Sequence, residues 1–115
     1  MNEKYNDFTK RLITFSVQTL RFAEKLKARR MLWSIIDQLI RSATSVGANI
    51  VEAKASSSRR EYINFFQIAL KSANETRYWL IVIRESDPSL DLEIRPLLTE
   101  TEELVKIIGS SVLTM

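Results

Sequence analysis

The chain of 115 residues contains no cysteine and no histidine. Without cysteine it has no disulfide, no thiolate nucleophile and no Cys-based zinc site. Without histidine it lacks the usual general base, a Ser-His triad and the Glu-x-x-His ligands of metal-binding helical bundles. These absences argue against an enzyme and against a bound cofactor. We therefore expect a non-enzymatic protein with no catalytic, cofactor-binding or metal-binding residues.

Glycine and proline are also scarce, with two of each, which favours long uninterrupted elements over many turns. Apolar runs such as Leu80–Ile83 fall far short of a membrane span. The segment Met1–Lys10 is too polar for a signal peptide. We expect one domain over residues 1–115, located in the cytoplasm and without a membrane partner.

Charge is unevenly distributed along the chain. The formal net charge is +3. Residues 1–60 hold 12 Lys and Arg against 5 Asp and Glu, a net +7, whereas residues 61–115 hold 5 against 9, a net −4. This asymmetry points modestly toward a polyanionic partner such as RNA or DNA.

Four segments place apolar residues at alternating steps of four and three, the spacing of an amphipathic helix. No segment has the period of a strand. The predicted fold is an all-α, antiparallel up-down-up-down four-helix bundle. We expect the helices over about 8–26, from about Met31 to Lys54, from after Ser58 to about Glu85, and from Leu92 or Pro96 to Val112.

Turn and capping residues separate these helices. Asn6 or Asp7 is a plausible N-cap for the first helix. A serine of the segment 55–58 can cap the third, with Glu61 placed for a capping box. The segment Ser86–Ser89 contains a proline and is a strong stop signal.

A row of small and hydrogen-bonding side chains runs beside the apolar stripe of the second helix. A solvated face would normally carry Lys and Glu, so this row indicates close contact with another helix, in the same chain or in another. We expect Lys71, Asn74, Glu75 and Tyr78 of the third helix to face it, with Arg41 near Glu75 or Tyr78. The predicted polar seam comprises Gln38, Arg41, Ser42, Ser45, Asn49, Glu52, Asn74 and Glu75.

Two interpretations of the polar seam stay open. It can be a satisfied polar network that fixes helix register or a subunit interface, or it can line a binding or catalytic groove. We favour the network, because no nucleophile, general base or set of metal ligands accompanies the seam.

Basic residues cluster at both ends of the predicted bundle. Lys25, Lys27, Arg29 and Arg30 end the first helix, where Glu85, Asp87, Asp91 and Glu93 would partly neutralise them. Lys54, Arg59 and Arg60 flank the second turn. They share their end with the cations Lys4, Lys10, Arg11 and Lys106 and with the acidic residues Glu3, Asp7, Glu52 and Glu61. We expect this second end to be the more positive and to contact nucleic-acid phosphates. Favourable charge at helix ends is the alternative explanation for both clusters. The candidate residues are Lys10, Arg11, Lys25, Lys27, Arg29, Arg30, Lys54, Arg59 and Arg60.

Most aromatic residues fall on or beside the apolar stripes, so we expect them in the core. Tyr62 and Tyr78 have polar neighbours and either stack on a base or line a subunit interface. We favour the interface.

The run QLIRSATSVGANIVEA over residues 38–53, followed by IALKSANET over 68–76, resembles the bacterial four-helix-bundle proteins encoded in intervening sequences of 23S rRNA genes. The accessory proteins of diversity-generating retroelements, which form pentamers and bind a reverse transcriptase and nucleic acid, are related to that family. The resemblance implies a homopentamer and favours binding of RNA or DNA, or a scaffolding role. The alternative is a protein-only adaptor, such as an accessory subunit of a retroelement reverse transcriptase.

Overall fold

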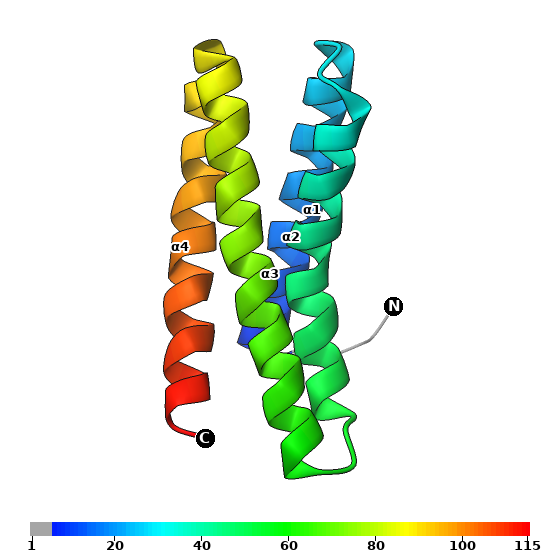
Figure 1. The fold of residues 1–115 in the computed structure, drawn as a ribbon, viewed down its shortest axis with the longest axis vertical. Coiled ribbons are helices and arrows are strands. Elements are labelled where there is room, and N and C mark those ends of the chain that lie inside the picture. The colour runs from blue at the N-terminus through cyan, green and yellow to red at the C-terminus, as the bar shows by residue number, and fades with distance from the viewer. Residues whose placement is uncertain (1–5) are drawn as a thin grey trace.

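The structure is a computed structural model that describes residues 6–115. It contains four helices, which are α1 (Asp7–Ala28), α2 (Trp33–Lys54), α3 (Arg59–Ser86) and α4 (Asp91–Leu113), with a short 3-10 helix, η1 (Pro88–Leu90), before α4. Successive helices run in opposite directions (Figure 1). The predicted all-α four-helix bundle is therefore confirmed.

Side chains cap the first and third helices where the sequence indicates. Asn6 accepts a hydrogen bond from the Thr9 backbone N–H at 2.7 Å, so Asn6 rather than Asp7 caps α1. Ser58 accepts one from the Glu61 N–H at 3.1 Å and caps α3. The Glu61 carboxylate accepts a hydrogen bond from the Ser57 hydroxyl, so only the serine half of the predicted capping box forms.

The fourth helix starts earlier than the proline led us to expect. It begins at Asp91, directly after η1, and contains Pro96 in its second turn. Proline cannot donate to the carbonyl of Leu92, four residues earlier. Leu92 is 74% exposed, so water can reach this part of the helix and bond to that carbonyl.

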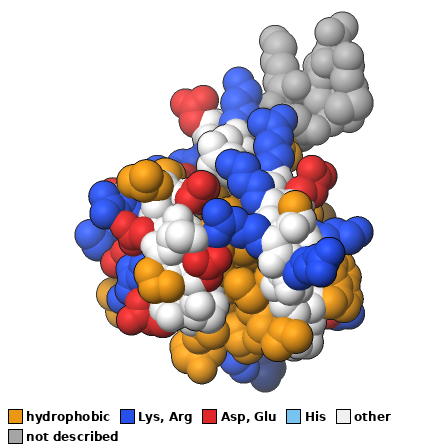
Figure 2. Space-filling view, turned by 90° about the horizontal axis from the view of Figure 1, so that it is seen from above, with side chains coloured by type: hydrophobic (Ala, Val, Ile, Leu, Met, Phe, Trp, Pro, Cys, Tyr) orange, Lys and Arg blue, Asp and Glu red, His pale blue; other side chains and the backbone are white. Residues whose placement is uncertain are grey.

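The core follows the apolar stripes of all four helices. Figure 2 looks onto the end of the bundle that holds the α1–α2 turn and shows hydrophobic side chains between the helices. The α2–α3 pair is the most extensive and the α1–α4 pair the least. A Cβ atom added at Gly47 would lie 3.3 Å from the Cβ of Leu12, so glycine allows α1 to pack closely on α2. The largest fully buried side chains are Phe15, Leu12, Leu26, Ile36, Leu39, Ile50, Leu80, Ile83, Leu90, Ile94, Leu104 and Ile108.

The turn after α1 contains an arginine in a conformation that favours glycine. Arg30 has a φ of 62°. Its N–H bonds to the carbonyl of Lys27, and the N–H of Met31 bonds to the carbonyl of Leu26, both at 3.0 Å. These two bonds form a Schellman motif, in which the left-handed position is usually glycine.

Replacing Arg30 with glycine is expected to stabilise the fold. The Cβ strain of a left-handed residue is relieved, and glycine's greater freedom in the unfolded chain cancels part of the gain, leaving about 0.5–1 kcal/mol. Chemical denaturation measures the difference. The control is Arg30→Ala, which removes the same charge but keeps the Cβ atom. An equal gain in both variants would show that charge, and not backbone strain, is responsible.

Candidate functional site

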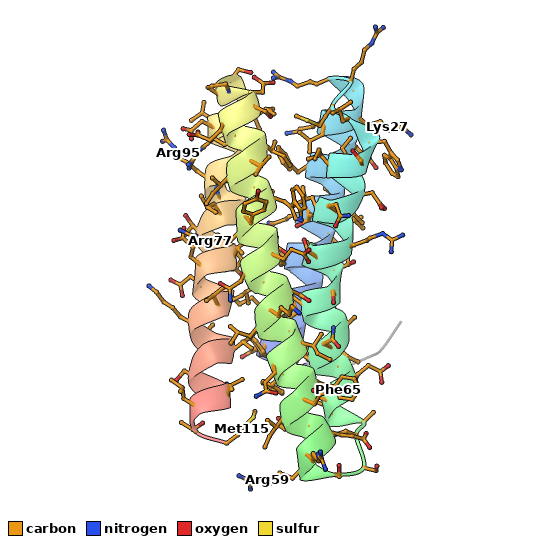
Figure 3. All side chains as sticks on the ribbon, viewed as in Figure 1. Lys27, Arg59, Phe65, Arg77, Arg95 and Met115 are labelled. Atoms are coloured by element: carbon orange, nitrogen blue, oxygen red, sulfur yellow. The ribbon has the colours of Figure 1, made fainter. Side chains whose placement is uncertain are left out.

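The α2–α3 turn forms the far tip of one end of the bundle. It extends past the start of α1 and the end of α4 (Figure 1). Lys54, Arg59 and Arg60 flank it, and all three are exposed. The Lys54 ammonium donates to the Thr9 hydroxyl at 2.8 Å. Arg59 donates to the backbone carbonyl of Met115, which lies at the same end (Figure 3). We call Lys54, Arg59 and Arg60 the basic tip.

The other cations predicted at this end have different environments. Lys10 is exposed on α1 and Lys106 on α4, whereas Lys4 lies outside the described residues. Arg11 instead binds Glu100 of α4 through two hydrogen bonds of 2.7 Å, with Glu103 at 3.8 Å. The hydrogen bond to Glu100 is the main cause of a raised pKa of Arg11. Arg11 therefore joins α1 to α4, the least extensive helix pair, and is less available to a ligand than Lys10.

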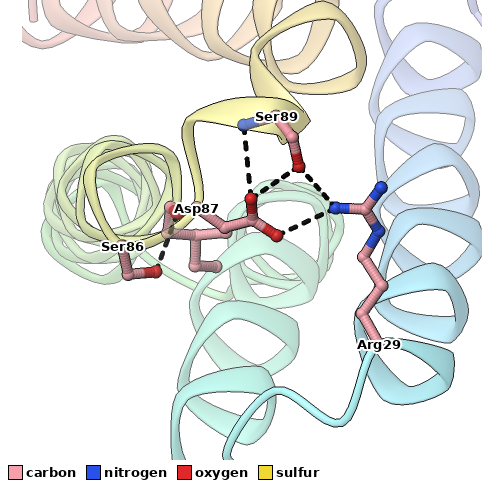
Figure 4. A network of polar contacts seen from close by, with 5 residues as sticks. Arg29, Ser86, Asp87 and Ser89 are labelled. Carbon is pink, nitrogen blue, oxygen red and sulfur yellow. Dashed lines mark hydrogen bonds and ion pairs between the residues drawn. The ribbon is translucent and has the colours of Figure 1, made fainter.

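At the opposite end, which holds the α1–α2 turn, a carboxylate neutralises the charge of one arginine, as expected. Arg29 donates to the Asp87 carboxylate at 2.8 Å and to the Ser89 hydroxyl at 2.7 Å (Figure 4). Lys25, Lys27 and Arg30 are exposed. Figure 2 shows Lys and Arg side chains interspersed with Asp and Glu over this end. Arg29 thus holds the α1–α2 turn against the α3–α4 connection.

Asp87 is the centre of this network. Its carboxylate accepts from the Ser89 hydroxyl at 2.6 Å and from the Ser89 N–H at 3.2 Å. These contacts lower the pKa of Asp87, with the Ser89 hydroxyl as the largest cause and Arg29 as a further one, against an opposing effect of burial. A lowered folded-state pKa means that the ionised carboxylate stabilises the fold.

Changing Asp87 to asparagine is expected to destabilise the protein at neutral pH and to matter less in acid. The stabilisation exists above the unfolded-state pKa of about 4 and is lost as pH falls through the lower folded-state pKa. Thermal melts from neutral pH down to pH 3 measure the gap between parent and variant. If the difference in melting temperature between parent and variant stays constant from neutral pH to pH 3, the ionised Asp87 carboxylate does not stabilise the fold. Ser89→Ala removes the main cause of the lowered pKa of Asp87, so the pH range over which this stabilisation is lost should become narrower.

The polar seam is divided between the helix interface and the surface. Ser42 is buried, and its hydroxyl accepts from Thr76 at 3.0 Å. Ser45 accepts from Ser72, also at 3.0 Å. Asn49 is half-buried and donates to the backbone carbonyl and hydroxyl of Ser45 on its own helix. The Ser42–Thr76 and Ser45–Ser72 bonds set the register of α2 against α3, because each joins one turn of α2 to one turn of α3.

The rest of the seam does not lie in this contact. Arg41 is exposed and pairs with Asp37 at 2.9 Å on its own helix, and among the described residues it has no hydrogen bond or ion pair to Glu75 or Tyr78. The α3 side chains that bond to the seam are Ser72 and Thr76, which were not among the predicted partners Lys71, Asn74, Glu75 and Tyr78. The exposed members of this set are Gln38, Arg41, Glu52, Lys71, Asn74, Glu75 and Tyr78.

The two tyrosines have different surroundings. Tyr62 is half-buried and stacked on Phe66 with ring centroids 4.9 Å apart, so it belongs to the core. Tyr78 is 60% exposed and makes a T-shaped contact with Trp79, with ring centroids 5.2 Å apart. The Trp79 indole N–H is buried and has no hydrogen-bond partner among the described residues. Of Tyr62 and Tyr78, Tyr78 is therefore the one whose ring is more available to a ligand.

Two further searches over residues 6–115 are negative. No helix there is both long and apolar enough to cross a membrane. No group of three or more acidic side chains is gathered there in a way that could hold a metal ion.

Comparison with known proteins identifies the family. Residues 4–110 match the model of the 23S rRNA-intervening sequence protein. A crystal structure of a protein of unknown function from the S23 ribosomal protein family of Bacteroides thetaiotaomicron is 31% identical, with a TM-score of 0.85. The match covers 90% of this chain and 96% of that one. The comparison with curated proteins gave no match. The chain belongs to the 23S rRNA-intervening sequence protein family.

Proposed function

We propose that the protein is a non-enzymatic, oligomeric nucleic-acid-binding or scaffolding protein of the cytoplasm, and that it holds RNA or DNA by the phosphate backbone. The observation that carries the proposal is the basic tip, where three exposed cations flank the most protruding turn of the bundle. Repetition of this turn around a ring would raise the local positive potential well above that of one chain.

An uncovered apolar face supports assembly. Ile13, Val17 and Leu20 lie on one side of α1 at steps of four and three, and each is more than a third exposed. Val51 of α2 is also exposed. Val51 and Ile13 line a shallow groove between α1 and α2, which is also lined by Gly47 and other small residues. Apolar rows of this kind are typical of interfaces. From the resemblance to retroelement accessory proteins, we expect the oligomer to be a pentamer.

The test of nucleic-acid binding is a fluorescence anisotropy titration with a labelled structured RNA. Phosphate contacts release counterions, so affinity should fall steeply between about 50 and 200 mM salt. One titration at each salt concentration gives the slope of log affinity against log salt concentration. No binding at low salt, with the protein folded by circular dichroism, would refute the proposal.

The second candidate is a protein-only adaptor, such as an accessory subunit of a reverse transcriptase. The same apolar face on α1 and α2 favours it, because this face fits a protein partner as well as a second copy of the chain. Such an adaptor would bind a partner protein while showing no salt-sensitive affinity for RNA or DNA.

A further inference from the structure

The outward face of α3 carries a row of polar side chains that continues away from the basic tip. Its members follow one another at steps of four and three residues, which places them on one line opposite the core. At 1.5 Å per residue the row is about 27 Å long. All of them are exposed, and we call the row the amide stripe: Arg60, Asn64, Gln67, Lys71, Asn74 and Tyr78.

The amide stripe contains two cations and no carboxylate. On α3, Glu61 and Glu75 lie beside it, toward α2, and Glu85 lies beyond its end. The other helices present acidic side chains on their outer surfaces, as a solvated surface normally does. Examples are Glu24 on α1, Glu52 on α2 and Glu102 on α4. The composition of the amide stripe therefore differs from that of the rest of the surface.

The side chains of the stripe are available for contacts outside the chain. Asn74 donates to the carbonyl of Leu70 at 3.2 Å, while Asn64 and Gln67 have no hydrogen bond to the described residues. Arg60, Asn64 and Gln67 line a hollow of about 610 Å³ on the surface, together with Ser58, Ile63 and the acidic Glu61. Each free amide offers two donors and one carbonyl acceptor, which is the complement of a base edge.

We propose that a single strand of RNA or DNA lies along the amide stripe, continuing from the basic tip. Arg60 and Lys71 contact phosphates, the amides bond to unpaired base edges, and Tyr78 stacks on a base, with its ring held by the T-shaped contact with Trp79. This inference rests on the proposed function, because the basic tip supplies most of the charge that attracts the strand.

The chemistry of the row favours a single strand over the other occupants. A helix of another protein would need an apolar seam, and Tyr78 is the one aromatic anchor in the stripe. In a duplex the Watson–Crick edges are paired and the base faces are stacked on one another, so Tyr78 could not stack on a base. A single strand exposes both the Watson–Crick edges and the faces.

The test compares affinities for a labelled single-stranded RNA, its DNA equivalent and the matching duplex, each of about 15 nucleotides. The first variant combines Asn64→Ala, Gln67→Ala and Asn74→Ala. Alanine is a better helix former than either amide, so the variant should fold. Loss of three neutral hydrogen bonds predicts an affinity for single strands about tenfold lower or more, with an unchanged salt slope.

Further variants separate the individual contacts. Lys71→Gln should reduce the salt slope by about one phosphate contact. Tyr78→Phe should keep the affinity that Tyr78→Ala loses, because stacking needs the ring and not the hydroxyl. The control variant combines Gln18→Ala with Thr99→Ala and removes exposed polar groups from α1 and α4. Its affinity for single strands and its salt slope should equal those of the parent.

Three results would overturn the inference. If the amide variant binds single strands as tightly as the parent, the amide stripe is an ordinary solvated face. The basic tip would then be the proposed binding site without the stripe. Equal affinity of the parent for single strands and duplex would rule out contacts that need unpaired and unstacked bases. If the parent binds no strand at low salt, the proposed function fails and the inference fails with it.

Discussion

Replacing Lys54, Arg59 and Arg60 together with alanine is expected to lower affinity for RNA at least about tenfold at low salt and to flatten the salt slope by two to three phosphate contacts. The three side chains are exposed on the protruding α2–α3 turn, and their bonds to Thr9 and Met115 use only part of their donors. Helix content should be unchanged, because the fold needs none of these charges. Anisotropy titrations over a range of salt concentrations measure both quantities.

The matched control removes the same number of positive charges elsewhere. Arg41, Arg77 and Arg95 are exposed and pair with carboxylates on the sides of the bundle. Their replacement with alanine gives the same net charge as the tip variant. Equal losses of affinity in the two variants would mean that net charge attracts RNA and that the basic tip is no site.

Leu39→Ala is expected to cost about 2–5 kcal/mol of unfolding free energy. Leu39 is 0% exposed and lies on α2, which packs most extensively on α3. Truncation removes three buried carbons and leaves a cavity that packed helices fill poorly. A domain of this size has a total stability of about 5–15 kcal/mol, so the loss is a large fraction of the total. If the parent lies at the low end of that range, the variant should be partly unfolded at room temperature. Urea denaturation followed by circular dichroism measures the change.

Leu92→Ala is the matched control, since it makes the same chemical change at a residue that is 74% exposed on α4, away from the apolar face of α1. Its cost should be a small fraction of the cost at Leu39. A comparable loss of unfolding free energy at both positions would show that burial does not determine the cost. A small loss at Leu39 would contradict the core described above.

The apolar spacing was enough to predict the helices and their order, because burial of one face dominates the stability of an amphipathic helix. It did not predict which α3 side chains bond to the polar seam. Thr76 is buried because its hydroxyl bonds to the Ser72 carbonyl and to the Ser42 hydroxyl. Spacing alone does not predict such side-chain bonds, so Ser72 and Thr76 were not among the expected partners of the seam.

The ion pairs could not be predicted individually. Arg11 and Glu100 are 89 positions apart, and several other acidic residues lie at comparable heights in an antiparallel bundle. Which of them meet depends on how α1 packs against α4, the least extensive of the helix pairs. The neutralisation of Arg29 by Asp87 was easier to foresee, because both flank turns at the same end of the bundle.

The most direct test of the central proposal is the mass of the protein in solution by light scattering, with and without a short structured RNA, at low and moderate salt. The proposal predicts a pentamer that gains the mass of RNA at low salt and loses it at moderate salt. A monomer, or an oligomer whose mass is the same with and without RNA at both salt concentrations, would contradict it and favour the protein adaptor.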